Sequence, residues 1–110
     1  MASTSLYGGQ DLPMLDKLTI ESFEPHVGTS FWLHTENRKV ELRLIRAAKV
    51  MESEATRLPR APFSLFFLAP LLLPQQIYRL THEAFAEPLD IFLVPIGRDA
   101  SGFTHEAVFT

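Results

Sequence analysis

The sequence predicts an all-β domain, a small antiparallel β-barrel or sandwich of about six short strands with one short helical turn near the N-terminus. Runs of 5 to 8 residues rich in β-branched and aromatic side chains recur between turn residues, which is the spacing of small barrels and sandwiches. Residues 40–44, within the predicted strand 40–47, alternate apolar and polar side chains, the pattern of a strand with one buried face. We favour a closed barrel, because closure removes the strand edges that invite uncontrolled pairing.

Length and composition set the domain organisation. With 110 residues, 46% hydrophobic and 21% charged, the chain has the size and composition of one globular domain with its own core. Residues 1–14 mix Ser, Thr, Gly and Pro without periodicity, so we expect a flexible or docked arm there and the domain proper over residues 15–110.

The absence of cysteine excludes disulfides, thiolate zinc sites and cysteine nucleophiles. The N-terminus lacks a basic start followed by an apolar segment, so no signal peptide is expected and the chain should be synthesised and folded in the cytoplasm. The longest apolar run, residues 65–74, is too short to cross a bilayer and is interrupted by Pro70. No membrane span is expected.

The first elements are a helical turn and a hairpin. Thr19 can cap one helical turn over residues 20–24, which Pro25 and Gly28 then end. Residues 30–34 and 40–47 are predicted strands on either side of the polar loop 35–39. The connection 50–62 is polar and contains two prolines, so we predict a loop with one or two helical turns within residues 51–57.

The second half of the chain supplies the remaining strands. Residues 63–68 are apolar on both faces apart from Ser64, which is typical of a central strand. An unusually apolar connection follows over residues 69–75. The last three predicted strands are residues 77–81, 89–96 and 103–109, joined by residues 82–88 and 97–102. The second joint has the Gly and Asp content of a hairpin turn.

Charge is unevenly distributed, although the net charge is only −3. Residues 38–60 hold seven of the ten basic residues and three of the thirteen acidic ones. Nucleic-acid binding normally requires a larger basic excess, so no nucleic-acid partner is expected. A lopsided surface suits head-to-tail association between protein chains at least as well as nucleic-acid binding.

Four segments together resemble a known family: LDKLTIESFEPHVGTSFWLH, PFSLFF, LPQQIYRLTH and LDIFLVPIGRDASGFTHEAVF. They resemble the bacterial domain family of unknown function DUF6916 over about residues 15–109. The resemblance implies a small all-β domain without an established activity, often encoded near phage-tail-collar-like proteins, and so a place in a phage-tail-like, fibre-like or exported assembly. Gln76 stands where the family usually has Gly, and His105 where it usually has Tyr.

The four histidines, His26, His34, His82 and His105, do not predict a metal site. None has a diagnostic spacing to another ligand. Two of them precede a glutamate, but adjacent side chains on a strand point to opposite faces. We therefore interpret all four as ordinary surface or strand-end histidines and expect neither a metal nor another cofactor.

Catalysis is not expected either. No Gly-x-Ser-x-Gly elbow is present, and the glycines have no phosphate-binding spacing. Asp90, Asp99 and Glu106 could in principle pair as acid and base, but solvated strand faces and turn caps account for them more simply. The sequence indicates a protein that is not an enzyme.

Apolar residues outside the predicted core are the better functional candidates. Trp32 alternates with Phe31 and Leu33, so it should face outward as an interface anchor, or alternatively lie beneath the 50–62 loop. Leu71, Leu72 and Leu73 stand in a connection that is ordinarily polar, so we expect a partner to cover them, although burial within the domain is the alternative.

These features favour a non-enzymatic structural or accessory protein that contacts a protein partner or its own copies. The interface candidates are Trp32, Leu71, Leu72 and Leu73. The alternative is a module that binds a small molecule or carbohydrate at the barrel mouth, with Trp32 or Tyr78 stacking on the ligand.

Overall fold

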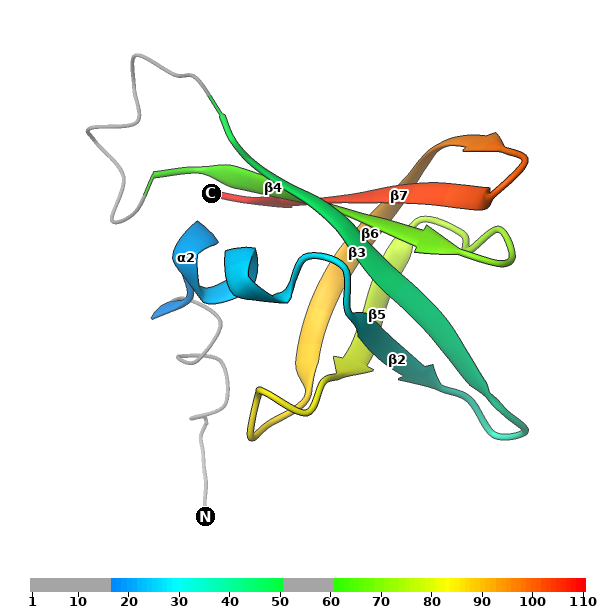
Figure 1. The fold of residues 1–110 in the computed structure, drawn as a ribbon. Coiled ribbons are helices and arrows are strands. Elements are labelled where there is room, and N and C mark those ends of the chain that lie inside the picture. The colour runs from blue at the N-terminus through cyan, green and yellow to red at the C-terminus, as the bar shows by residue number, and fades with distance from the viewer. Residues whose placement is uncertain (1–16, 51–60) are drawn as a thin grey trace.

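Six antiparallel strands close into a barrel in the computed structural model, which describes residues 17–50 and 61–110 (Figure 1). A helical turn, α2 (Ile20–Phe23), and a 3-10 turn, η1 (Glu24–His26), precede the barrel. The strands are β2 (Ser30–His34), β3 (Lys39–Lys49), β4 (Phe63–Ala69), β5 (Gln76–Thr81), β6 (Leu89–Asp99) and β7 (Gly102–Phe109). The predicted arm at residues 1–14 and helical turns at residues 51–57 lie outside the described residues.

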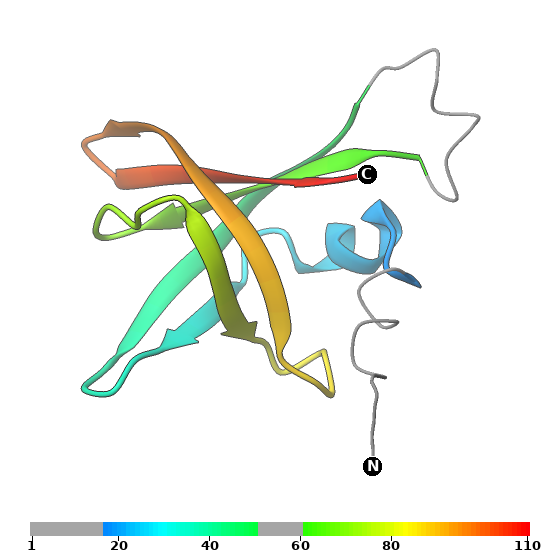
Figure 2. The same cartoon turned by 180° about the vertical axis from the view of Figure 1, so that it is seen from behind.

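The strands are arranged around the barrel in the order β2-β3-β4-β7-β6-β5, which confirms the predicted closed barrel. The closing seam joins β2 to β5 through two residue pairs, Trp32 with Thr81 and Leu33 with Leu80. This seam is much shorter than the ladder between β4 and β7, which pairs seven residues of each strand. Figure 2 shows from behind how β6, in orange, crosses β7, in red.

All six predicted strands are present, and β2 has the predicted bounds. The joint predicted over residues 97–102 is tighter than expected, because β6 runs on to Asp99 and β7 begins at Gly102. The Asp99 carboxylate accepts the backbone N–H of Ser101 at 2.7 Å, an arrangement by which Asp side chains stabilise turns. The hairpin prediction is therefore confirmed with a shorter loop.

A bulge interrupts the alternation in β3. Leu44 is paired with Phe67 and Arg46 with Phe66, so Ile45 has no residue opposite it. A single extra residue shifts the following side chains to the other face of the strand. Arg46 consequently joins Arg43 on the outside of the barrel instead of facing the core.

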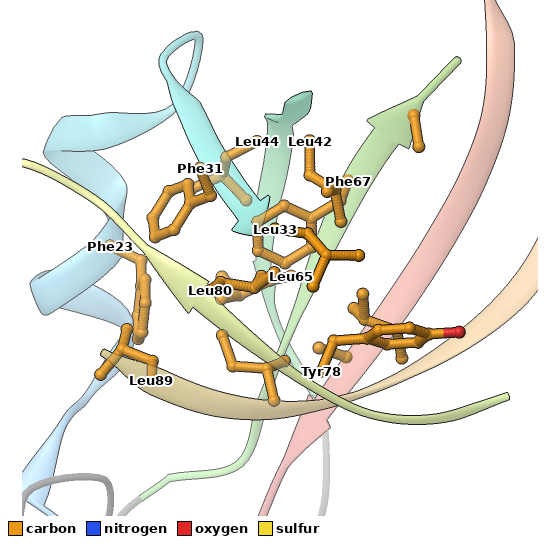
Figure 3. Packing of buried hydrophobic residues seen from close by; sticks show 14 of the residues in the cluster. Phe23, Phe31, Leu33, Leu42, Leu44, Leu65, Phe67, Tyr78, Leu80 and Leu89 are labelled. Carbon is orange, nitrogen blue, oxygen red and sulfur yellow. The ribbon is translucent and has the colours of Figure 1, made fainter. Parts of the chain in front are cut away.

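The barrel interior is filled by apolar side chains from every strand, as Figure 3 shows. The large side chains with less than 2% exposure are mainly Phe and Leu, including Phe31, Phe67, Leu42, Leu44, Leu65, Leu80 and Leu93. Burial of each such side chain is worth about 1.5–3 kcal/mol. The strands are thus held together by a packed core.

The N-terminal turns cover one end of the barrel. Phe23 of α2 lies with its ring centroid 5.4 to 6.4 Å from the rings of Phe31, Phe63, Phe85 and Phe109. Thr19 begins the helix as predicted, since its backbone N–H donates to the Ser22 hydroxyl at 3.1 Å.

None of the helices within residues 17–50 and 61–110 has the length and apolar character needed to cross a membrane.

The predicted end of the helical turn is wrong in one respect. Pro25 does not stop the turn, because it occupies the start of η1, where its missing N–H costs no hydrogen bond. Gly28 follows η1 with a φ of 97°, a conformation that glycine adopts readily. Its N–H then bonds to the carbonyl of Leu44 and fixes the entry into β2.

Candidate functional site: the surface around Trp32

Trp32 lies on the outer face of β2, as the alternation predicts. Its neighbours Phe31 and Leu33 are buried in the core, whereas the indole is half-buried. The Lys39 ammonium lies 4.9 Å from the centroid of the indole, which is within cation–π distance. The indole is thus supported on one side by β3 and keeps part of its surface free of the described residues.

Two hollows flank Trp32, and the indole lines both. The hollow toward β5 measures about 430 Å³ and is also lined by Thr29, Ser30, Thr81, His82 and Glu83. The hollow toward β3 measures about 570 Å³ and is also lined by Arg38, Lys39, Val40, Glu41, Pro70 and Leu71. We call Trp32 and the linings of these hollows the Trp32 surface. The alternative position of Trp32, beneath residues 50–62, involves a segment that is mostly outside the described residues.

The three leucines chosen from the sequence have three different environments. Leu71 is half-buried and lines the hollow beside Trp32. Leu72, the next residue, is 55% exposed, whereas Leu73 is 5% exposed and belongs to the core. The fold therefore brings Trp32 and Leu71 to one surface and leaves Leu72 next to it in the chain. Leu73 is covered by its own domain, so it leaves the set of surface candidates.

The two hollows carry opposite charges. Arg38 and Lys39 line the hollow toward β3, and neither forms an ion pair with another described residue. The carboxylate of Glu41 in the same hollow accepts a hydrogen bond from the Ser30 hydroxyl. Glu83 is exposed at the hollow toward β5. The lining of the hollow toward β3 thus carries a net positive charge, although Glu41 is part of it, and the lining of the hollow toward β5 carries a negative one.

His82 is held as a neutral imidazole. The Thr29 hydroxyl donates to the carbonyl of His26 at 2.7 Å, so its oxygen accepts from Nε2–H of His82 at 2.8 Å. Nδ1 of His82 accepts the backbone N–H of Ala84 at 3.0 Å. Burial, and next the nearby His26, lower the pKa of His82. With both ring nitrogens engaged, His82 positions the turn after β5 and is not available as a base or metal ligand.

His105 contradicts the prediction of surface or strand-end histidines. It lies in the middle of β7 with no exposed surface, because the alternation of β7 places it on the same inner face as Ala107 and Phe109. Its Nε2 accepts the backbone N–H of Leu73 at 3.1 Å, and its buried Nδ1 has no hydrogen-bond partner among the described residues. Burial lowers the pKa of His105.

The acidic residues singled out from the sequence each have a structural partner. Asp90 forms two hydrogen bonds with Arg79, at 2.8 and 3.0 Å, and these bonds lower its pKa. Glu106 accepts the Ser64 hydroxyl at 2.9 Å, and Asp99 caps its turn. Within the described residues, no three His, Asp or Glu side chains gather to hold a metal ion.

Sequence reasoning missed the hollows and the opposite charges that flank Trp32. Lys39 lies directly across from His34 in the β2–β3 ladder, and Glu83 follows Thr81, which is paired with Trp32. The first pairing could have been anticipated from the predicted hairpin. The second depends on barrel closure, which no local pattern encodes.

Comparison with known proteins gives one match. Residues 18–109 match the family model described as "Domain of unknown function (DUF6916)". No curated protein and no solved structure matches the chain.

Proposed function

We propose that this chain, which belongs to the DUF6916 family, is a non-enzymatic structural or accessory protein that contacts another protein chain through the Trp32 surface. The observation that carries the proposal is the meeting of Trp32, Leu71 and Lys39 at one hollow, with the exposed Leu72 alongside. A phage-tail-like or fibre-like bacterial assembly is the proposed setting, by analogy with the family resemblance.

The composition of this surface favours a protein partner. Tryptophan and arginine are the residue types that most often anchor interfaces, particularly beside a pocket from which water is expelled on binding. Trp32 and Arg38 line the same hollow, and Leu71 gives it an apolar wall. Leu72 is 55% exposed, and removing its exposed apolar area from water favours association.

A second candidate function is binding of a small molecule or carbohydrate. The observation in its favour is the hollow toward β5, where the hydroxyl-bearing residues Thr29, Ser30 and Thr81 lie beside the indole. The barrel lumen is filled, and Tyr78 is 8% exposed with its hydroxyl bonded to the carbonyl of Pro74, so a ligand would bind outside the barrel. This function predicts a ligand-dependent rise in melting temperature.

Site-specific photo-crosslinking tests the proposed function without assuming the identity of the partner. A photoreactive amino acid replaces Leu72 in one variant and Ile77 in a control, in cells that naturally contain the protein. Ile77 is 64% exposed but lines neither hollow. We expect covalent protein adducts from position 72 and far fewer from position 77. Equal yields at the two positions would contradict the proposal.

A further inference from the structure

We infer that the Trp32 surface binds a second copy of this chain, in a symmetric dimer whose two-fold axis passes beside Trp32. This inference rests on the proposed function and names its partner. Charges of opposite sign lie on the two sides of the indole, so a two-fold rotation places the positive side of one copy against the negative side of the other.

The charges lie on opposite sides of Trp32. Arg38 and Lys39 line the hollow toward β3, and Glu83 lines the hollow toward β5. All three side chains are exposed, and none of them forms an ion pair with another described residue. The hollow toward β3 also contains the Glu41 carboxylate, which accepts a hydrogen bond from Ser30, so its lining carries one net positive charge. The surface therefore has a side of net positive charge, an aromatic centre and a negative side.

A two-fold rotation brings unlike charges together. In a symmetric dimer, every contact between two different residues occurs twice: residue i of the first copy contacts residue j of the second, and residue j of the first contacts residue i of the second. If Trp32 is at the axis, Lys39 of each copy faces Glu83 of the other, so the attraction occurs twice. Orientations that bring like charges together are disfavoured by repulsion, so electrostatics favours this one orientation.

The hollows provide room for the contact. Each hollow is open beside the indole, and together they extend from the β2–β3 hairpin to the turn after β5. The indole of one copy can enter a hollow of the other. In the hollow toward β3 it would be shielded from water by Leu71, and in the hollow toward β5 by Thr81 and its neighbours. The exposed Leu72 adds apolar area at the rim of the same surface.

Long-range electrostatics does not favour association, since each chain carries a net charge of −3. The attraction must come from the local pairing of opposite charges. Such exposed charges interact over about 8–10 Å at physiological salt and over shorter distances as salt is added. Self-association through this surface should therefore weaken at high salt.

A charge-swap experiment tests the dimer, with the native mass measured by light scattering over a range of concentrations. Lys39→Glu and Glu83→Lys each place like charges opposite one another twice, so we expect each to weaken self-association by about a hundredfold. Mixed in equal amounts, the two variants pair unlike charges again and should regain a mass twice that of the 12.5 kDa chain.

Matched controls lie on the same elements. Lys49→Glu changes a lysine at the other end of β3, and Glu87→Lys changes an exposed glutamate of the same turn as Glu83; neither residue lines a hollow. Both control variants should dimerise like the wild type. These controls separate a local contact from an effect of net charge.

Three results would overturn the inference: a single-chain mass for the wild type at every concentration, dimers that persist in both charge variants, or a mixture that fails to regain the dimer. The proposed function would survive the first result if position 72 still crosslinked to a different protein. It would fail with the inference only if those crosslinks were also absent.

Discussion

Leu73 donates its backbone N–H to Nε2 of His105, 3.1 Å away inside the barrel. The bond ties the connection between β4 and β5 to the middle of β7, which lies 32 residues further along the chain. It requires a ring nitrogen without a proton, so the buried imidazole must be neutral. The same bond holds Leu73 inward while leaving Leu72 at the surface.

Stability should fall as the pH decreases below about 6.5. The pKa values of His105 and His82 are both lowered in the folded protein, chiefly by burial. The unfolded chain therefore binds protons more readily than the folded chain, so the stability present above pH 6.5 is progressively lost below it. Glu21 and Asp90 also have lowered pKa values, but these act below their ordinary values of 4.5 and 3.8.

A His105→Tyr variant isolates the contribution of His105, because tyrosine does not titrate in this range. We expect a smaller loss of melting temperature between pH 7 and pH 5 than in the wild type. An identical pH dependence in His105→Tyr and the wild type would rule out His105 as its source.

Leu72 and Leu73 should differ sharply in their effect on folding. Leu73→Ala removes a side chain that is 5% exposed, so we expect a loss of about 2–5 kcal/mol in the free energy of unfolding. Leu72→Ala, at a position 55% exposed, should change it by less than about 0.5 kcal/mol. Urea denaturation measures both values, and similar losses at the two positions would contradict the assignment of Leu73 to the core.

Gly102 should not tolerate a side chain. Its φ is 143°, and an added Cβ would lie 2.6 Å from the carbonyl oxygen of Ala69. We expect Gly102→Ala to reduce the free energy of unfolding by about 1–3 kcal/mol. Gly97→Ala is the control, since nothing lies within 4 Å of a Cβ at that position. If thermal denaturation shows equal effects, the geometry of the β6–β7 turn is wrong.

Leu72→Asp should disrupt association without unfolding the domain. A carboxylate in place of an exposed leucine disfavours covering by a partner, because burial of an unpaired charge is costly. We expect a lower oligomeric mass or the loss of a co-purifying protein, with an unchanged melting temperature. Ile77→Asp, which changes an exposed residue paired with Phe92 away from the hollows, should leave association unaffected. Wild-type behaviour of Leu72→Asp in both assays would exclude Leu72 from the interface.

The strands could be predicted because their signals are local. Alternation in β3 and the turn residues near Asp99 depend on residues close in sequence, and the structure confirms both. The bulge at Ile45 could not be predicted, since it depends on the pairing of β3 with β4. The burial of His105 follows from the alternation of β7, which is a local signal, but its role as an acceptor could not be predicted, because it depends on the return of Leu73 from another part of the chain.

The candidate site was predictable only in part. Alternation placed Trp32 on the outer face of β2, and the unusual composition of the 69–75 connection drew attention to its leucines. Their different environments follow from the path of the backbone, which buries Leu73 and directs Leu71 to the hollow beside Trp32. The proximity of Glu83 follows from closure of β2 onto β5.

The fluorescence of Trp32, the single tryptophan in the chain, tests the inferred dimer most directly. If a second copy covers the Trp32 surface, raising the protein concentration should shift the indole emission to shorter wavelength and reduce its quenching by acrylamide. Lys39→Glu should abolish both changes. The inferred dimer would be contradicted if the emission and quenching of the wild type stayed constant as its concentration rose, while its mass remained that of one chain.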